Sequence, residues 1–318
     1  MISNSTDTNT SFEHKSVLLE ESIDGLNINS NGVYVDGTVG LGGHSEKIVQ
    51  KLTGGRLFCF DLDKAAISIA SDRLSIYGDK IVFINDDYKN MIKYLEKDKV
   101  SEIDGIILDL GMSSMQIDDA SRGFSYMNNG YLDMRMDKES QLTAFEVVNN
   151  YSYEDLVTLF KEYGEEINAN RIAHEILKRR AVKKIETTTE LADIICSSYP
   201  MREKRKGHPA KKVFQAIRIE VNNELRGLYE FICAALLRLK VGGRGVFITF
   251  HSLEDRIVKQ AIQYLEKDCV CDKKAPICTC NKRSEVKIIN KKPIVASIEE
   301  IKKNSRAQSA KLRIVERI

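Results

Sequence analysis

The apolar positions of the first third of the chain alternate between two spacings. Short apolar runs, typical of buried strands, are each followed by a stretch with apolar residues at helical spacing. The four runs cover residues 33–35, 56–60, 80–84 and 103–108. Four alternations of strand and helix predict a parallel, doubly wound α/β sheet.

This alternation stops near residue 111. Residues 112–137 are rich in Gly, Ser, Asp and Asn, and a loop of this length inside a domain is usually functional or disordered. Residues 143–199 show helical spacing only, with capping-box sequences that begin at Ser152 and Thr187. One long amphipathic helix is then predicted for residues 213–239.

The last part of the chain returns to a strand pattern. A fifth apolar run covers residues 245–250, and two more β-like runs follow at 286–289 and 312–315. They predict a parallel sheet that finishes with an antiparallel element. We therefore expect a Rossmann-like α/β sheet domain, an all-helical insert and a disordered tail. The sheet domain is expected to combine residues 13–115 with residues 214–318. The helical insert should cover residues 116–213, and the tail residues 1–12.

Composition is that of a soluble globular protein in a reducing compartment. Of the 318 residues, 42% are hydrophobic and 30% are charged, and no apolar run is long enough to cross a membrane. Seven cysteines without a secretion signal favour the cytosol over a disulfide framework. We expect a cytoplasmic protein without membrane contact.

Charge changes this picture because it is unevenly distributed. The net charge is only +2, yet residues 171–212 hold 12 Lys and Arg against 5 Asp and Glu, and residues 281–318 hold 11 against 4. Each segment therefore carries +7, and the rest of the chain is acidic. Two basic zones on an acidic protein predict a polyanionic partner.

An aspartate stands at the end of each of the four predicted strands: Asp36, Asp61, Asp87 and Asp109. The carboxyl ends of parallel strands meet at one edge of a sheet, so these side chains are expected to converge on one crevice. Asp61 lies 19 residues after Gly42, where a nucleotide-binding fold places the carboxylate that accepts the ribose hydroxyls. The alternative is that each aspartate only starts a turn.

A glycine-rich turn at residues 40–45 separates the first strand from the next helix and lets a ligand approach bare backbone. Its sequence, GLGGHS, nearly matches the dinucleotide motif, so an NAD-dependent oxidoreductase is one alternative. The position of His44 departs from that motif. Asp36, ahead of the glycines, suits a cationic amino group. This favours S-adenosylmethionine, with Asp61 at its ribose and Tyr88 at its adenine.

Several uncommon strings occur in one order along the chain. They are HKSVLL at 14–19, DGT at 36–38, GGHS at 42–45, DGIILDLG at 104–111, SSMQ at 113–116, RGFSY at 122–126, LDMRMD at 132–137, FHSLEDR at 250–256 and SAKLR at 309–313. With them, the chain resembles the bacterial RsmH/MraW family from about residue 14 to its end. Two positions depart from the forms expected there, because Met115 replaces a proline and Tyr88 a phenylalanine.

The resemblance implies a fold, a reaction and a site. Family members are Rossmann-like class I S-adenosylmethionine-dependent methyltransferases that methylate the exocyclic N4 amine of one cytidine in the decoding region of small-subunit (16S) ribosomal RNA. The implied partner is this RNA within the 30S subunit, and a homodimer is left open. The cofactor contacts carried over by the resemblance are Gly42, Gly43, His44, Asp61, Tyr88, Asp109 and Gln116.

The implied reaction needs a hydrogen-bond acceptor beside the target amine. A cytosine amine is a poor nucleophile, because its lone pair is delocalised into the ring. The site must align it with the sulfonium methyl and accept an N–H hydrogen bond. Asp109, or a carbonyl of the 110–114 turn, could be that acceptor. Asp109 is thus the candidate catalytic residue, although it could serve the cofactor alone, and we predict no metal in this site.

RNA contact has its own candidates. The target base must leave its stack, and the loop after the fourth strand offers aromatic rings and arginines for it, unless these only pack the loop. The loop residues in question are Phe124, Tyr126, Tyr131, Arg122 and Arg135. Basic residues between 178 and 212 could contact phosphates. His251, near the end of the fifth strand, could face the crevice.

Four cysteines near the C-terminal part form two C-x-C pairs, namely Cys269 with Cys271 and Cys278 with Cys280. Four thiolates could hold a tetrahedral zinc ion, although zinc sites more often use C-x-x-C pairs, so this question stays open. A second functional alternative also remains from the residues alone, a catalytically inactive RNA-binding assembly factor.

Overall fold

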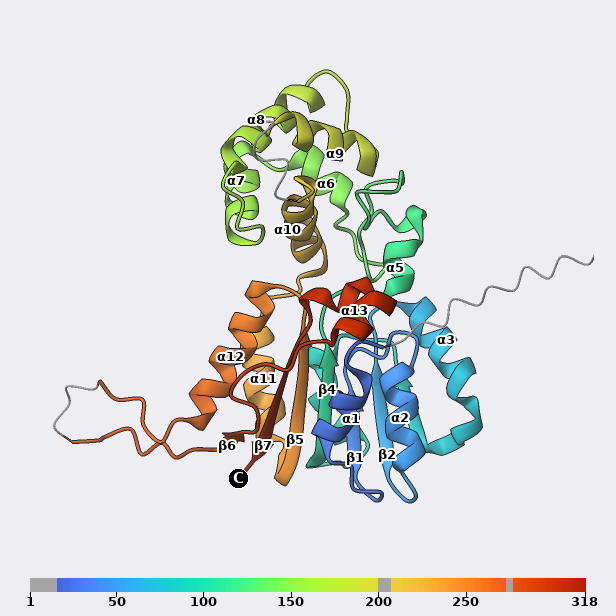
Figure 1. The fold of residues 1–318 in the computed structure, drawn as a ribbon, viewed down its shortest axis with the longest axis vertical. Coiled ribbons are helices and arrows are strands. Elements are labelled where there is room, and N and C mark those ends of the chain that lie inside the picture. The colour runs from blue at the N-terminus through green and yellow to red at the C-terminus, as the bar shows by residue number, and fades with distance from the viewer. Residues whose placement is uncertain (1–15, 200–206, 273–276) are drawn as a thin grey trace, which may run out of the picture.

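The computed structural model describes residues 16–199, 207–272 and 277–318, so the tail expected at residues 1–12 lies outside the described residues. A seven-stranded sheet with the order β3-β2-β1-β4-β5-β7-β6 forms its centre (Figure 1). Strands β1 to β5 run parallel, and β7 pairs antiparallel with both β5 and β6. The expected parallel sheet with an antiparallel ending is confirmed. The strands are β1 (Val33–Asp36), β2 (Arg56–Phe60), β3 (Ile81–Ile84), β4 (Ile103–Asp109), β5 (Leu239–Thr249), β6 (Val286–Ile288) and β7 (Lys311–Arg317).

Helices cover both faces of the sheet (Figure 1). On β1, Tyr34 belongs to one apolar core and Val35 to the other, because successive side chains of a strand point to opposite faces. Burial on both faces explains why these strands are continuous apolar runs in the sequence. One core packs against α1 (Leu19–Leu26), α2 (Gly43–Lys51) and α3 (Lys64–Leu74), and the other against α4 (Met91–Lys97), α11 (Leu228–Leu237) and α12 (Ser252–Glu266).

A third core belongs to a helical body beyond the carboxyl edge of the sheet (Figure 1). Its helices are α6 (Ala144–Asn150), α7 (Tyr153–Glu162), α8 (Ala169–Arg180), α9 (Thr188–Ser197) and α10 (Ala210–Asn222). Glu165 ties this body to α12, because its carboxylate accepts hydrogen bonds from Ser252 and Arg256, each at 2.8 Å. Two short helices, α5 (Ser114–Asp118) and α13 (Ile298–Lys303), lie between body and sheet. Among the described residues, no helix is long and apolar enough to span a membrane.

The prediction of one helix over residues 213–239 is wrong. The chain forms α10 and α11 instead, with a break at Asn223 and Gly227, whose φ angles are 51° and 74°. Asn and Gly tolerate this left-handed conformation, which ends a helix. The break also divides the apolar face, because Phe214 packs into the helical body and Leu228 packs onto the sheet. Strand β5 accordingly starts at Leu239, earlier than expected.

Candidate active site

A cavity of about 770 Å³ opens at the carboxyl ends of β1, β2 and β4, between the sheet and the helical body. Of the seven cofactor contacts implied by the resemblance, only Gly42 is absent from its wall, and it directly precedes a wall residue. Those that line the cavity are Gly43, His44, Asp61, Tyr88, Asp109 and Gln116. The structure therefore brings together residues that come from separate parts of the sequence.

The glycine turn forms the first wall. Gly40 and Gly42 have φ angles of 51° and 83°, a left-handed conformation that glycine adopts without the steric cost of a side chain. A Cβ atom on Gly43 would stand 2.0 Å from the hydroxyl oxygen of Ser16, so a larger residue here would require the Ser16 side chain to move. Gly42 is the N-cap of α2 without a side-chain cap, and the first N–H groups of that helix lie at the turn.

Asp36 corrects one prediction. It does not line the cavity, because its side chain turns under the glycine turn and is 2% exposed. One of its carboxylate oxygens accepts the Ser45 hydroxyl at 2.6 Å, and the other accepts the Thr38 N–H at 3.1 Å. Burial raises the pKa of Asp36 to about 6. Asp36 therefore holds the turn and is not placed to meet a cationic ligand.

Asp61 does line the cavity, at the end of β2. Its carboxylate accepts the N–H groups of Gly40 and Asp63, both at 2.9 Å. Burial raises its pKa to about 6, although these two N–H donors act in the opposite direction. Asp61 thus fixes the glycine turn and presents a carboxyl group to the cavity.

Asp109 ends β4 on the cavity wall. One of its carboxylate oxygens, Oδ1, is buried and has no hydrogen-bond partner among the described residues. The other, Oδ2, lies 3.9 Å from Nδ1 of His44, whose Nε2 donates to the carbonyl of Val17 at 3.2 Å. Burial, and then the charges of Asp36 and Glu254, raises the pKa of Asp109 well above its usual range. Asp109 is therefore a buried acceptor that still lacks a donor.

Tyr88 stands on the opposite wall, beyond the end of β3. Its ring packs edge-on against Phe231 at 4.9 Å between centroids, and the ammonium of Lys89 lies 5.8 Å from the ring centre. Burial raises the pKa of its hydroxyl well above the usual range. The ring is thus fixed and neutral, as a flat packing surface requires.

Gln116 belongs to a buried network that the sequence did not reveal. Its side-chain amide donates to Asp63 at 3.0 Å, and its carbonyl oxygen accepts the N–H of Ser113. The guanidinium of Arg122 donates to the same Asp63 carboxylate at 2.6 Å and to the carbonyls of residues 135 and 136. Burial raises the pKa of Asp63, but the bonds from Gln116 and Arg122 outweigh it and lower the pKa.

This network contradicts a phosphate-binding role for Arg122. The Arg122 side chain is 5% exposed, and its two terminal nitrogen atoms donate hydrogen bonds to Asp63 and to backbone carbonyls. Arg135 is similarly engaged, with Asp133 and with the carbonyls of residues 138 and 140. Both arginines hold the loop together, so the packing role applies to them and the phosphate-contact role does not.

The aromatic side chains of the loop divide between two roles. Phe124 and Tyr126 line the cavity, and the ring of Tyr126 stacks on His208 at 4.4 Å between centroids. Tyr131 does not line it and stacks on Phe145 instead. The loop thus offers Tyr126 to the cavity, while Tyr131 packs the helical body.

A charged cluster closes the far side of the cavity. His251 is the N-cap of α12, and its Nε2 lies 2.9 Å from Glu254 without a hydrogen-bonding alignment. Arg218 pairs with Glu224 at 2.8 Å. Burial raises the pKa of Glu254, but His251 and Arg218 outweigh it and lower the pKa. The sequence placed His251 near the crevice, and it missed Arg218 and Glu224, although these two lie only six positions apart in the chain.

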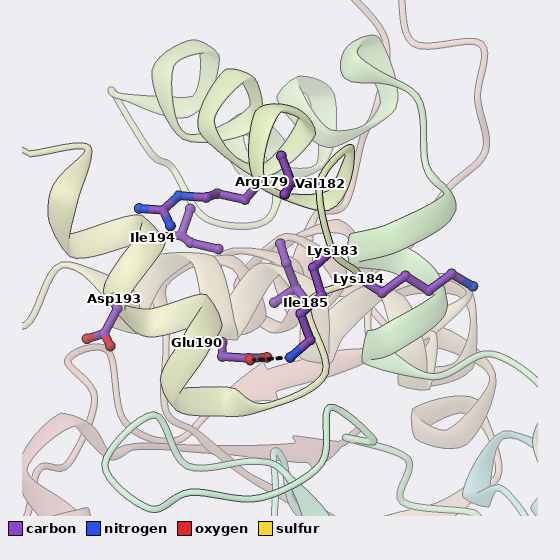
Figure 2. A pocket seen from close by; sticks show the side chains of 8 residues that line it. All are labelled: Arg179, Val182, Lys183, Lys184, Ile185, Glu190, Asp193 and Ile194. Atoms are coloured by element: carbon purple, nitrogen blue, oxygen red, sulfur yellow. Dashed lines mark hydrogen bonds and ion pairs between the residues drawn. The ribbon is translucent and has the colours of Figure 1, made fainter.

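The basic run between residues 178 and 212 is only partly available. Arg180 donates to the carbonyls of Val148 and Tyr151, while Lys211 lines the cavity. A separate hollow of about 300 Å³ lies on the helical body, with Arg179 and Lys183 on its wall (Figure 2). Residues 200–206, which hold four more predicted basic contacts, lie outside the described residues.

Known proteins resemble this chain over nearly its whole length. It is 52% identical to ribosomal RNA small subunit methyltransferase H of Clostridioides difficile (strain 630), with 96% of this chain and 99% of that protein covered. The proteins of the same name from Clostridium botulinum (strain Loch Maree / Type A3) and Finegoldia magna are 50% and 47% identical at the same coverage. A solved rRNA methylase from Streptococcus thermophilus is 14% identical with a TM-score of 0.40, over 94% of this chain and 95% of that one. Because the model of the MraW methylase family matches residues 11–318, the chain belongs to that family.

Proposed function

We propose that this chain transfers a methyl group from S-adenosylmethionine to the exocyclic N4 amine of a cytidine in small-subunit (16S) ribosomal RNA. Membership of a methylase family supports methyl transfer, and neither the oxidoreductase nor the inactive assembly factor has support. The observation that carries the proposal is the Asp109 carboxyl, which stands on the wall of a nucleoside-sized cavity with its side chain 24% exposed.

The cavity residues fit the methyl donor by their chemistry. The donor supplies an electrophilic methyl on a sulfonium. The carboxyl of Asp61 suits ribose hydroxyls, and the fixed ring of Tyr88 suits the flat adenine. Backbone at Gly42, Gly43 and His44 suits the amino acid end, since the two glycines carry no side chain. Gln116, held by Asp63, completes the assigned set.

Asp109 then serves the target amine. The Asp109 side chain is 24% exposed on the cavity wall, so its carboxylate can accept an N–H hydrogen bond from the cytosine amine, and this orients the nitrogen lone pair toward the methyl group. As the nitrogen becomes cationic, that bond strengthens. The raised pKa of Asp109 lets it take a proton after transfer, because burial favours the neutral carboxyl.

In this proposal the RNA binds against the helical body on its way into the cavity. Tyr126, stacked on His208, offers a ring to a base that has left its stack. Lys211 adds a positive charge at the cavity, and Arg179 and Lys184 add two more on the helical body, where Lys183 is paired with Glu190 (Figure 2). We further propose the assembled 30S subunit as the form of the substrate.

Incubation with labelled S-adenosylmethionine tests the activity. Small subunits from cells that lack this protein should acquire one N4-methylated cytidine, detected by mass spectrometry of the digested RNA. Protein-free ribosomal RNA, run in parallel, separates the assembled subunit from naked RNA as substrate. Subunits already methylated by wild-type cells are the matched control and should take up no label. Absence of N4-methylcytidine from both RNA forms would contradict the proposal.

Cofactor binding should strengthen as the pH rises toward neutrality. The pKa of Asp61 in the free protein is about 6, and hydroxyl donors of a ribose favour its ionised form. Below that pKa the proton must be released on binding, so affinity for S-adenosylhomocysteine falls by up to about tenfold per pH unit. Calorimetry in two buffers of different ionisation enthalpy measures the released protons. Asp61→Asn should bind more weakly and with less pH dependence, and a pH-independent wild-type affinity between pH 5 and pH 7 would refute the link.

A further inference from the structure

A cysteine-bearing excursion connects α12 to β6 and extends away from the body of the protein (Figure 1). Its described parts hold Cys269 and Cys271 on the outgoing limb and Cys278 and Cys280 on the returning limb. None of these cysteines lines the cavity of the active site. The proposed methyl transfer therefore leaves them without a role.

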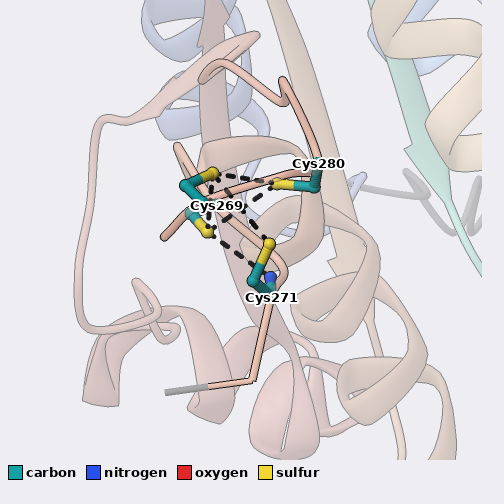
Figure 3. Close-up of side chains that lie close together, drawn as sticks. Cys269, Cys271 and Cys280 are labelled. Carbon is teal, nitrogen blue, oxygen red and sulfur yellow. Dashed lines mark hydrogen bonds between the residues drawn. The ribbon is translucent and has the colours of Figure 1, made fainter. Parts of the chain in front are cut away.

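The four sulfur atoms form one compact cluster. Every pair lies within 4.8 Å, and the Sγ atom of Cys278 is 3.4 Å from that of Cys269, 3.6 Å from that of Cys280 and 4.0 Å from that of Cys271. Cys269 and Cys280 are 3.7 Å apart (Figure 3). Four thiolates around a tetrahedral zinc ion, each about 2.3 Å from it, stand about 3.8 Å from one another. The cluster thus has the size of a zinc tetrathiolate.

Backbone N–H groups point at these sulfur atoms. Val270 donates to Cys280 at 3.5 Å, and the N–H of Cys271 lies 3.4 Å from Cys269. Thr279 donates to Cys271, also at 3.4 Å. Such donors orient metal-bound thiolates and stabilise their negative charge. The two C-x-C turns therefore supply both ligands and second-layer donors.

Neither a disulfide nor apolar packing accounts for this cluster. A disulfide requires one sulfur pair at about 2.05 Å, whereas the separations here are similar for pairs within and between the limbs. Apolar packing cannot hold the limbs either, because Val270 and Ile277 are 45% and 74% exposed. Something other than a hydrophobic core must join the limbs at this point.

We propose that Cys269, Cys271, Cys278 and Cys280 bind one structural Zn²⁺ ion. Four thiols lose four protons as four S–Zn bonds form, so the site carries a net charge of −2, and no electron is transferred. The ammonium of Lys282, on the returning limb, donates to the carbonyl of Lys267 where the other limb begins. The ion cross-links the two limbs and takes no part in methyl transfer.

Metal analysis of the full-length protein tests the site. The protein is purified under reducing conditions without chelator and is then dialysed against buffer that contains a trace of zinc. We expect about one zinc per chain, and less than a tenth of that in Cys278→Ser/Cys280→Ser. Cys233→Ser, a thiol outside the cluster, is the matched control and should keep its zinc. Replacement by Co²⁺ should give the absorption of a tetrahedral thiolate complex in the wild type and not in the double variant.

The failures are distinguishable. Zinc retained by the double variant, zinc absent from the wild type, or iron found in its place each overturns the proposal. S-adenosylhomocysteine affinity should be unchanged in the double variant, since the cysteines lie outside the cavity. This inference therefore does not depend on the proposed function, and failure of the methyl-transfer assay would leave the zinc measurement intact.

Discussion

Replacing Asp109 with alanine should lower kcat for methyl transfer by about 10²- to 10⁴-fold at saturating cofactor, the range found for a positioned acid or base. The Asp109 side chain is 24% exposed on the cavity wall, so its carboxylate can reach the target amine. Alanine removes this acceptor and leaves the end of β4 otherwise intact. Single-turnover measurements with pre-bound cofactor report the chemical step directly.

Two further variants show which property of Asp109 matters. Asp109→Asn keeps a carbonyl acceptor of the same size but cannot take a proton, so it should recover part of the lost rate. Asp104→Asn makes the same change at the other end of β4, where the side chain accepts from Val33 and Lys240. It should leave kcat within about twofold of the wild type, because it lies outside the cavity.

The same measurements decide between a catalytic role and a purely cofactor-binding role. If Asp109 serves only the cofactor, Asp109→Ala raises KM for S-adenosylmethionine and kcat recovers at saturation. Recovery of the wild-type kcat would thus contradict the catalytic assignment, while leaving Asp109 in the cofactor site.

The parallel sheet with its antiparallel ending and the position of the cavity could be predicted because both follow from local patterns. Buried parallel strands are continuous apolar runs, and their carboxyl ends share one edge of the sheet. Asp61 and Asp109 were therefore placed correctly on the cavity wall. A helix break was also signalled, by Asn223 and Gly227, but the continuous apolar spacing from Val213 concealed it.

Side-chain direction could not be predicted in the same way. Asp36 stands at a strand end like Asp61, yet the hydroxyl of Ser45, one helix turn into α2, draws it under the glycine turn. An arginine in a polar loop, Arg122 was a candidate phosphate contact. It binds the carboxylate of Asp63 instead, which lies 59 positions earlier in the chain. The direction of such a side chain depends on a partner from another part of the chain, and a single sequence does not show which residues will pair.

Arg122→Ala should destabilise the protein by about 3–5 kcal/mol, because it leaves the Asp63 carboxylate buried without its cation. The two side chains are 5% and 3% exposed and 2.6 Å apart. Arg56 and Asp98 form the matched control, with the same 2.6 Å separation but exposed fractions of 40% and 33%. Arg56→Ala should cost no more than about 1 kcal/mol, since solvent screens an exposed pair. Urea unfolding, followed by two spectroscopic probes, measures both.

A second substitution tests whether the buried charge is the cause. Asp63→Asn with Arg122→Ala removes the carboxylate and should be more stable than Arg122→Ala alone, because no uncompensated charge remains.

The pH dependence of the free energy of unfolding has a defined sign. Since the pKa of Asp63 is lowered below 3.8 in the folded protein, its pairing stabilises the fold above that pH and is lost as the pH falls through the lowered pKa. The stability gap between wild type and Arg122→Ala should therefore narrow in acid. A gap that stays constant down to pH 3, or a double variant less stable than Arg122→Ala, would mean that the arginine acts through its backbone carbonyl bonds to residues 135 and 136 instead.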